Sequence, residues 1–161
     1  MQRKNALAGL AFAALSYGAA ALGTLTMRGK GSPQGLWYRS RRKPSFQPPA
    51  QAFAPVWTVL YGTIAYSGWR IWRAKKSPER TKALRLWGTQ LALNAAWTPL
   101  FFGARKPALA LADIVALDVA AGTYAVAARD VDRHAALAVT PYLAWIAFAT
   151  ALNAGIVAKN R

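Results

Sequence analysis

Five long stretches of this sequence carry almost no charge, and each is long enough to cross a lipid bilayer as a helix. They are residues 5–27, 50–69, 86–104, 107–128 and 135–158. Only the fourth contains charged residues, the aspartates Asp113 and Asp118. A helical span needs about 20 residues, and backbone groups in hydrocarbon must be satisfied within the segment itself. The sequence therefore predicts the all-α class, as an integral membrane bundle of five transmembrane helices.

We expect one domain over residues 1–161. Its helices are predicted at about 6–27, 50–72, 84–104, 107–128 and 134–157, separated by short basic connections and one longer loop. The first stretch follows Arg3 and Lys4, so it also resembles a cleavable signal peptide. Its 23 uncharged residues exceed the usual apolar core of such signals, which favours a retained helix.

The chain is strongly basic, with 21 Lys and Arg against five Asp and Glu. A soluble protein of this charge would suggest nucleic-acid binding. Here the basic residues cluster between the uncharged stretches, which is typical of loops beside anionic lipid headgroups. We therefore expect a multi-pass membrane protein whose partner is the bilayer and not nucleic acid. The two sets of loops carry 11 and 10 basic residues, so the positive-inside rule favours neither orientation and names no particular membrane.

Signatures of common catalytic sites are missing from the sequence. It contains no cysteine and one histidine, His134, at the start of the last stretch. A single histidine at a membrane boundary is more typical of an interface residue than of a haem ligand. No phosphate-binding loop or metal-ligand spacing occurs. We expect no metal and no required cofactor, and any enzymatic activity would depend on Trp, Tyr and Asp.

Aromatic and polar residues recur at helical spacing in three of the predicted helices. These are Phe53, Trp57 and Tyr61; Asn94, Trp97 and Phe101; and Tyr142, Trp145, Ala149, Leu152 and Asn153. Asparagine in hydrocarbon needs a partner, so Asn94 and Asn153 are expected to face the bundle interior. They serve either as interhelical hydrogen bonds or as polar anchors of a ligand cavity.

The two aspartates of the fourth helix are unusual within a span and are functional candidates. Their separation of five residues corresponds to about 140° around a helix, so they do not form a carboxylate pair. Asp113 is the candidate for a cavity or structural acid. Asp118 is the candidate partner for another span.

The connection at residues 28–49 differs from an ordinary loop. Pro44, Pro48 and Pro49 predict an extended, stiff segment. Its aromatic residues, Trp37 among them, indicate either a belt at the headgroup level or a lid over the bundle mouth. Alanines recur at helical spacing in the third and fourth helices, which predicts close helix contacts within the chain or in a homodimer.

Four segments together resemble the TspO/MBR family of tryptophan-rich sensory proteins, translocator proteins and peripheral-type benzodiazepine receptors. They are KPSFQPP at 43–49, FAPVWTVLY at 53–61, QLALNAAWTPLFFGAR at 90–105 and PYLAWIAFATALN at 141–153. The resemblance extends over about residues 6–157. It implies a five-helix membrane bundle, usually dimeric, whose ligand cavity is closed by the first loop.

The resemblance also implies a ligand, a porphyrin such as protoporphyrin IX or haem. The expected binding residues are Trp37, Ala54, Trp57, Tyr61, Asn94, Trp97, Asp113, Trp145, Ala149 and Leu152. Of these, Tyr61 and Asp113 come from the helical spacing and the buried charge, and the others match family motifs. Trp57 and Trp145 match tryptophans linked in the family to light-dependent porphyrin breakdown, so they are the candidate catalytic residues.

The expected function is tetrapyrrole binding at a membrane, in porphyrin transport, sensing or disposal. The alternatives are a light-dependent porphyrin-degrading enzyme and a non-catalytic stress-regulatory scaffold. Leu109 replaces a tryptophan that contacts synthetic ligands in animal members, and the last helix lacks the tyrosine of the proposed sterol motif. We therefore expect no cholesterol-transport role.

Overall fold

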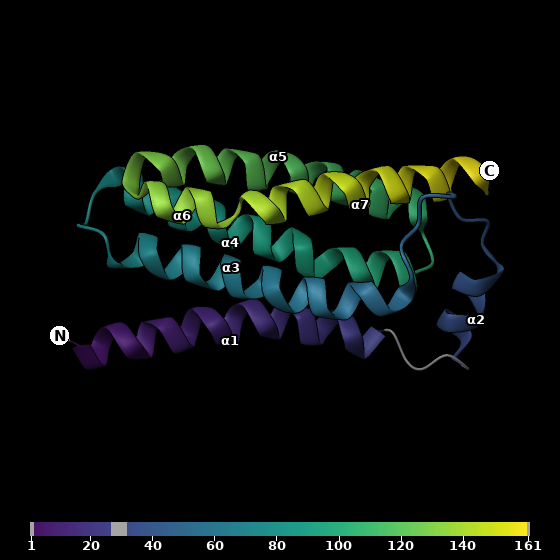
Figure 1. Cartoon of the computed structure of the whole chain (residues 1–161), viewed down its shortest axis with the longest axis horizontal. Coiled ribbons are helices and arrows are strands. Elements are labelled where there is room, and N and C mark those ends of the chain that lie inside the picture. Colours follow the sequence, from purple (N-terminus) through teal and green to yellow (C-terminus); the bar gives the residue numbers. More distant parts are fainter. Residues whose placement is uncertain (1, 27–31, 161) are drawn as a thin grey trace.

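The computed structural model describes residues 2–26 and 32–160, and within these ranges it is helical, with no strand. Five long helical segments run side by side along the molecule (Figure 1). They are α1 (Gln2–Thr26); α3 (Phe53–Arg73); α4 (Pro78–Thr98), continued by the π-helix η2 (Pro99–Gly103); α5 (Pro107–Val131); and α6 (Arg133–Ala138) followed by α7 (Thr140–Lys159). The predicted all-α membrane bundle of five helices is confirmed.

Among the described residues, three segments are long and apolar enough to cross a membrane by length and composition. These are Arg3–Gly23, Pro107–Val131 and Arg133–Lys159. Large apolar side chains on their outer faces remain exposed, including Leu10 at 67% and Val126 at 68%. Many large apolar side chains exposed on one molecule are unfavourable in water and favourable against lipid. This is an integral membrane protein.

Prolines interrupt the regular helix in two of the segments. Pro99 begins the π-helical turn η2, in which the amide of Ala104 donates to the Pro99 carbonyl at 2.8 Å. In the last segment, Pro141 lies just after the break at Val139 that separates α6 from α7. Proline lacks the N–H that would continue the regular hydrogen-bond ladder, so each site interrupts it.

The loop before α3 is only partly extended. A short helix, α2 (Pro33–Ser40), forms first, capped by the Ser32 hydroxyl, which accepts from the Gly35 amide at 3.1 Å. Residues 41–49 then lie outside any helix, and the 3₁₀ turn η1 (Ala50–Ala52) leads into α3, as the prolines predicted. Residues 28–31 of the expected lid lie outside the described residues, as does Met27 of the first expected helix.

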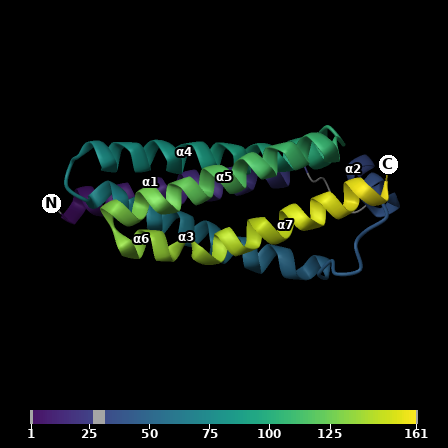
Figure 2. The same ribbon diagram turned by 90° about the horizontal axis from the view of Figure 1, so that it is seen from above.

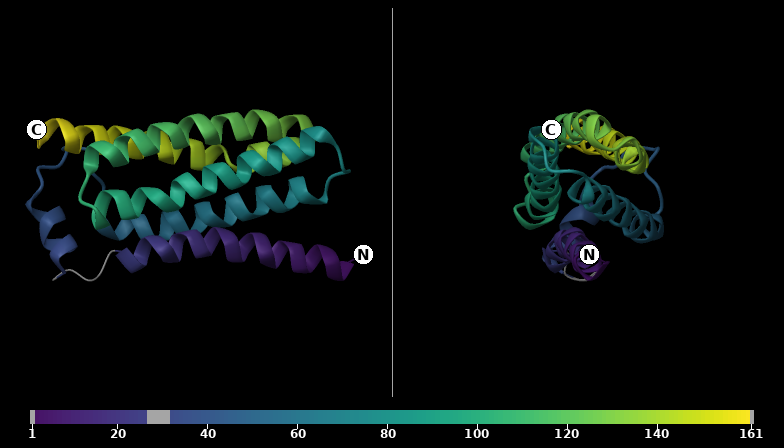
Figure 3. Two further views of the ribbon diagram at one scale, coloured as in Figure 1. Left: turned by 180° about the vertical axis from the view of Figure 1, so that it is seen from behind. Right: turned by 90° about the vertical axis from the view of Figure 1, so that its left-hand side faces the viewer.

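The helices pack in an order that places α3 between α1 and the last segment, α6 and α7 (Figures 1 and 3). The centre of the packing is Trp87 of α4, whose indole N–H donates to the Ile64 carbonyl at 2.9 Å. Its ring meets Phe12 of α1 edge to face, with 4.7 Å between ring centroids. Three helices therefore meet at one buried tryptophan.

Candidate ligand-binding site

An aromatic cluster joins α3 to α7, with Trp57 at its centre. The Trp57 ring centroid lies 5.3 Å from that of Tyr61, 6.4 Å from that of Tyr142 and 6.5 Å from that of Trp145. Trp145 also meets Phe53 at 5.8 Å. Trp57 and Tyr61 share one face of α3 because they are four residues apart, and Tyr142 and Trp145 share a face of α7 because they are three residues apart. Helical spacing therefore pairs the rings within each helix, and the packing of α3 against α7 brings the two pairs together.

Beneath these rings runs a ladder of buried hydrogen bonds that ties three helices together. The Tyr61 hydroxyl donates to Asn94 Oδ1 at 2.5 Å, and Asn94 Nδ2 donates to the Tyr142 hydroxyl at 3.2 Å. The Tyr142 hydroxyl donates in turn to Gln90 Oε1 at 2.9 Å. Buried polar groups need such partners in a low-dielectric core. The side chains of Gln90 and Asn94 in α4 thus form a polar layer beneath the aromatic cluster, which we call the polar floor.

A second aromatic cluster surrounds Phe101 in η2. Its ring stacks on Trp97 at 4.9 Å and meets Trp37 of α2 at 5.8 Å. The Trp97 indole N–H donates to Asn153 Oδ1 at 3.0 Å, and Asn153 Nδ2 donates to the Pro107 carbonyl at 2.9 Å. The expectation that Asn94 and Asn153 face the interior is confirmed, since they are 6% and 1% exposed.

The loop after α2 is fastened to α7 at several points. Pro44 is buried, and a Cβ added to Gly155 would lie 2.5 Å from its ring. The Arg42 amide donates to Asn160 Oδ1 at 3.0 Å, and Asn160 Nδ2 donates back to the Arg42 carbonyl at 2.8 Å. Phe46 meets Phe148 at 6.2 Å, and Phe148 meets Trp145 at 5.6 Å. These contacts hold the loop against α7 from Phe148 to its C-cap, Asn160.

Basic side chains line the loop above the second cluster. The Lys43 ammonium lies 4.8 Å from the Tyr38 ring centroid, and the Arg41 guanidinium lies 5.6 Å from that of Trp37. Burial raises the pKa of Tyr38, against a smaller lowering by its hydrogen bond with Gln47. The tyrosine is therefore neutral beneath a cationic rim.

Sequence comparison places these features in a family. The TspO/MBR family model matches residues 11–158, which include both aromatic clusters and the loop. The chain belongs to the TspO/MBR family. It is 43% identical to a translocator protein of Ovis aries over 134 residues, which cover 82% of this chain and 78% of the relative.

The chain is also similar to proteins of an archaeon and a bacterium. A tryptophan-rich protein TspO of Archaeoglobus fulgidus is 41% identical over 129 residues, which cover 77% of this chain and 80% of the relative. Protein CrtK of Rhodobacter capsulatus is 33% identical over 127 residues, which cover 78% of this chain and 79% of the relative. The family resemblance predicted from the motifs is confirmed.

The TspO/MBR fold leaves several of the predicted site residues outside the Trp57 cluster. Ala54 is exposed at the start of α3, while Ala149 and Leu152 lie on α7 at partly buried and buried positions. Trp37 and Trp97 belong to the Phe101 cluster. The structure therefore brings Trp57, Tyr61, Asn94 and Trp145 together in one set and Trp37 and Trp97 in another. The remaining predicted residues make no described ring contact or side-chain hydrogen bond with either set.

The two aspartates of this family member behave differently from each other. Asp118 accepts a hydrogen bond from the Thr150 hydroxyl of α7 at 2.7 Å, so the predicted partner in another span exists. Asp113 is partly buried, and its Oδ2 atom is buried without a hydrogen-bond partner among the described residues. No described contact joins Asp113 to either aromatic cluster.

Gln90 is a buried polar residue that was not among the predicted site residues, although its helical spacing from Asn94 indicates the same face of α4. Gln90 lies one turn before Asn94 on α4 and is 1% exposed. Its Nε2 atom has no hydrogen-bond partner among the described residues. A second glutamine or asparagine at this spacing within an uncharged span could have been read as part of the same polar floor.

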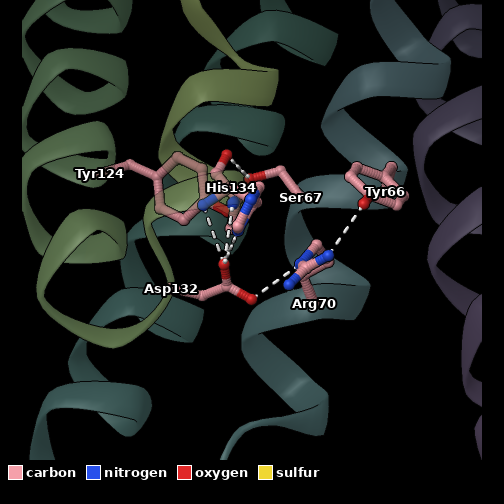
Figure 4. Close-up of polar contacts among 7 residues, drawn as sticks. Tyr66, Ser67, Arg70, Tyr124, Asp132 and His134 are labelled. Atoms are coloured by element: carbon pink, nitrogen blue, oxygen red, sulfur yellow. Dashed lines mark hydrogen bonds and ion pairs between the residues drawn. The ribbon is translucent and has the colours of Figure 1, made fainter.

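At the opposite end of the bundle, a polar cluster fastens α3 to the turn between α5 and α6 (Figure 4). Arg70 Nε donates to Asp132 Oδ2 at 2.7 Å, and Asp132 Oδ1 accepts from the His134 and Ala135 amides at 2.9 and 3.3 Å. Nearby, Ser67 donates to the Ala135 carbonyl at 2.7 Å and lies 2.6 Å from the Tyr124 hydroxyl. Within the described residues no group of His, Cys, Asp and Glu could hold a metal ion, and the backbone of His134 takes part in capping α6.

This cluster gives a prediction about pH and stability. Burial alone would raise the pKa of Asp132, but hydrogen bonds from Arg70 and from the Ala135 and His134 amides outweigh it and hold that pKa below its ordinary value. A lowered pKa means that the ion pair stabilises the fold above about pH 4 and that this contribution is lost as the pH falls through the folded-state pKa. We expect Asp132→Asn to lower the free energy of unfolding by about 1 kcal/mol at pH 7.

The measurement is thermal unfolding in detergent micelles at pH 7 and below pH 4, where the difference between Asp132→Asn and the unchanged protein should shrink. Asn keeps one oxygen for the capping bonds, but an NH2 group replaces the oxygen that accepts from Arg70 Nε, so the ion pair and its hydrogen bond are removed together. Asp130→Asn is the matched control, because Asp130 is exposed in the last turn of α5. An equal loss of stability in both variants would contradict a specific role for the Arg70–Asp132 pair.

Proposed function

We propose that this membrane protein binds a tetrapyrrole, either a porphyrin or haem, at the Trp57 cluster, and that it acts in porphyrin transport, sensing or disposal. The observation that carries the proposal is the convergence of four rings from α3 and α7 on a polar floor from α4. Flat aromatic macrocycles suit apolar sites with aromatic faces and few polar anchors.

Two further features support this ligand class. The indole N–H of Trp145 is buried and has no hydrogen-bond partner among the described residues, so it is available to an acceptor on the ligand. Arg41, Arg42 and Lys43 of the loop lie beside the Phe101 cluster, and we propose that they reach the propionate groups of a porphyrin whose ring lies at the Trp57 cluster. In the described conformation the rings touch one another, so ligand entry requires the loop and the rings to separate.

We further propose that all five helical segments cross the membrane and that the protein is a homodimer. Segments α3 and α4 are not among the three segments apolar enough to cross a membrane, but they are 21 residues long each, and both pack against α1. Exposed alanines of α5, including Ala112 and Ala116, support close contact with a second copy.

The test is a titration of the purified protein with protoporphyrin IX in darkness, followed by absorbance and tryptophan quenching. We expect Trp57→Leu to weaken binding about 10-fold, the scale of losing one stacking platform. Trp69→Leu is the matched control, because Trp69 lies on the same helix but donates to the Asn5 carbonyl at 2.9 Å, away from the cluster. Equal affinity of the two variants would overturn the assignment of the site.

A light-dependent chemical role is the second candidate function, and one observation favours it. Rings of Tyr61, Trp57 and Trp145 form a continuous series of contacts beside the proposed ligand. Repeating the titration under illumination in air separates the two candidates. Sharply slower porphyrin loss in Trp57→Phe and Trp145→Phe, with binding in darkness little changed, would support the enzyme. Unchanged porphyrin loss in both variants would leave tetrapyrrole binding as the only supported function.

A further inference from the structure

A hollow lies on the outer face of α4 near its N-terminus. It has a volume of about 600 Å³ and is lined by Pro78, Thr81, Lys82, Arg85 and Leu86. These positions are spaced by three and four residues, so they occupy one face of the helix. Two cations and two apolar side chains therefore share a single concave surface.

Three arginines at this end of the bundle are already engaged. Arg70 is paired with Asp132 (Figure 4), and the Arg73 guanidinium lies 4.5 Å from the Trp69 ring centroid. Arg80 donates twice to the Trp72 carbonyl, at 2.6 and 3.0 Å. By contrast, the side chains of Lys82 and Arg85 are exposed and make no ion pair or hydrogen bond with the residues that the structure describes.

The hollow also lies at a boundary in polarity. Lys82 and Arg85 are the last charged residues of α4, and Leu86 begins the uncharged stretch that continues to residue 104. Trp69 and Trp72, near the end of the adjacent α3, are typical of the headgroup level of a bilayer. The cationic part of the hollow therefore faces the headgroup layer, and its apolar part faces the acyl chains.

We propose that this hollow binds an anionic phospholipid, with its phosphate between Lys82 and Arg85 and its acyl chain along Leu86. Two basic side chains one helical turn apart can contact the same phosphate, and charge-assisted hydrogen bonds to it are stronger than neutral ones. The N-terminal end of α4 is at the end of the bundle opposite α2 and the loop (Figures 1 and 2). This lipid site is therefore separate from the proposed porphyrin site.

The test is native mass spectrometry of the delipidated protein titrated with phosphatidylglycerol or phosphatidylcholine. We expect preferential binding of phosphatidylglycerol, and about 25-fold weaker binding of the first such lipid to the double variant Lys82→Gln, Arg85→Gln, since each basic side chain contributes about five-fold. The control is the double variant Lys75→Gln, Lys76→Gln. It removes the same charge from the exposed connection between α3 and α4 and should bind within about two-fold of the unchanged protein.

Several outcomes would overturn the proposal. Equal weakening in both double variants would indicate diffuse attraction to the basic end of the chain. Displacement of phosphatidylglycerol by millimolar inorganic phosphate would indicate a site for free anions. Unchanged lipid binding together with reduced dimer crosslinking in Lys82→Gln, Arg85→Gln would assign this face to a second copy of the chain.

Discussion

Replacing Gly68 with alanine is expected to destabilise the bundle by about 2–3 kcal/mol, within the range for overpacking a core. A Cβ at Gly68 would lie 2.5 Å from Trp87 Nε1 and 2.7 Å from Phe12 Cδ1. Neither ring can move cheaply, because the Trp87 N–H is bonded to the Ile64 carbonyl and both rings are buried. Alanine favours helix by up to about 1 kcal/mol over glycine, which offsets only part of the cost.

Gly88→Ala provides the matched control for this prediction. Gly88 also lies within a long helix, but a Cβ there would meet nothing within 4 Å. It should leave stability unchanged or raise it slightly. The measurement is unfolding of both variants in mixed detergent micelles. If Gly68→Ala were as stable as Gly88→Ala, the close approach of α1, α3 and α4 at Trp87 would be wrong.

The number and type of the helices could be predicted because a bilayer restricts the choice. Uncharged length gave all five segments, and short connections gave their antiparallel order. The helix α2 and the break at Val139 could not be located in the same way. Both depend on contacts with distant residues. The Trp37 ring of α2 packs against Phe101, and the Ser67 hydroxyl donates to the Ala135 carbonyl, which the break at Val139 leaves without its helical partner.

Residues of the candidate site could be predicted where they share one face of a single helix. Trp57 and Tyr61 illustrate this, since a spacing of four residues places both rings together. Residues whose role depends on another helix were harder to assign. Asp113 was expected at the site because buried charge is costly, but no described contact brings it there. The pairing of Arg70 with Asp132 joins residues 62 positions apart, and no local pattern indicates it.

The loop packed against α7 should detach when Gly155 is replaced with alanine. A Cβ at this position would lie 2.5 Å from Cγ of Pro44, and a proline ring cannot rotate away. Displacing Pro44 also pulls Phe46 from Phe148, which in turn contacts Trp145. We expect trypsin to cleave after Arg41 and Arg42 about 10-fold faster, because cleavage follows the population of the locally open state. Release of bound protoporphyrin IX should accelerate in parallel.

Pro44→Ala supplies the decisive comparison, because it removes the ring atom that Ala at position 155 would strike. Trypsin cleavage should be equally fast in Pro44→Ala and in the double variant, whereas independent effects would add. Gly122→Ala is the neutral control, since a Cβ there meets nothing within 4 Å. Additive acceleration in the double variant would mean that Gly155 acts through α7 itself. Equal cleavage rates in Pro44→Ala and the double variant would instead show that the contact between Pro44 and Gly155 holds the loop against α7. Phe46 lies two residues beyond Pro44 and contacts Phe148, which contacts Trp145.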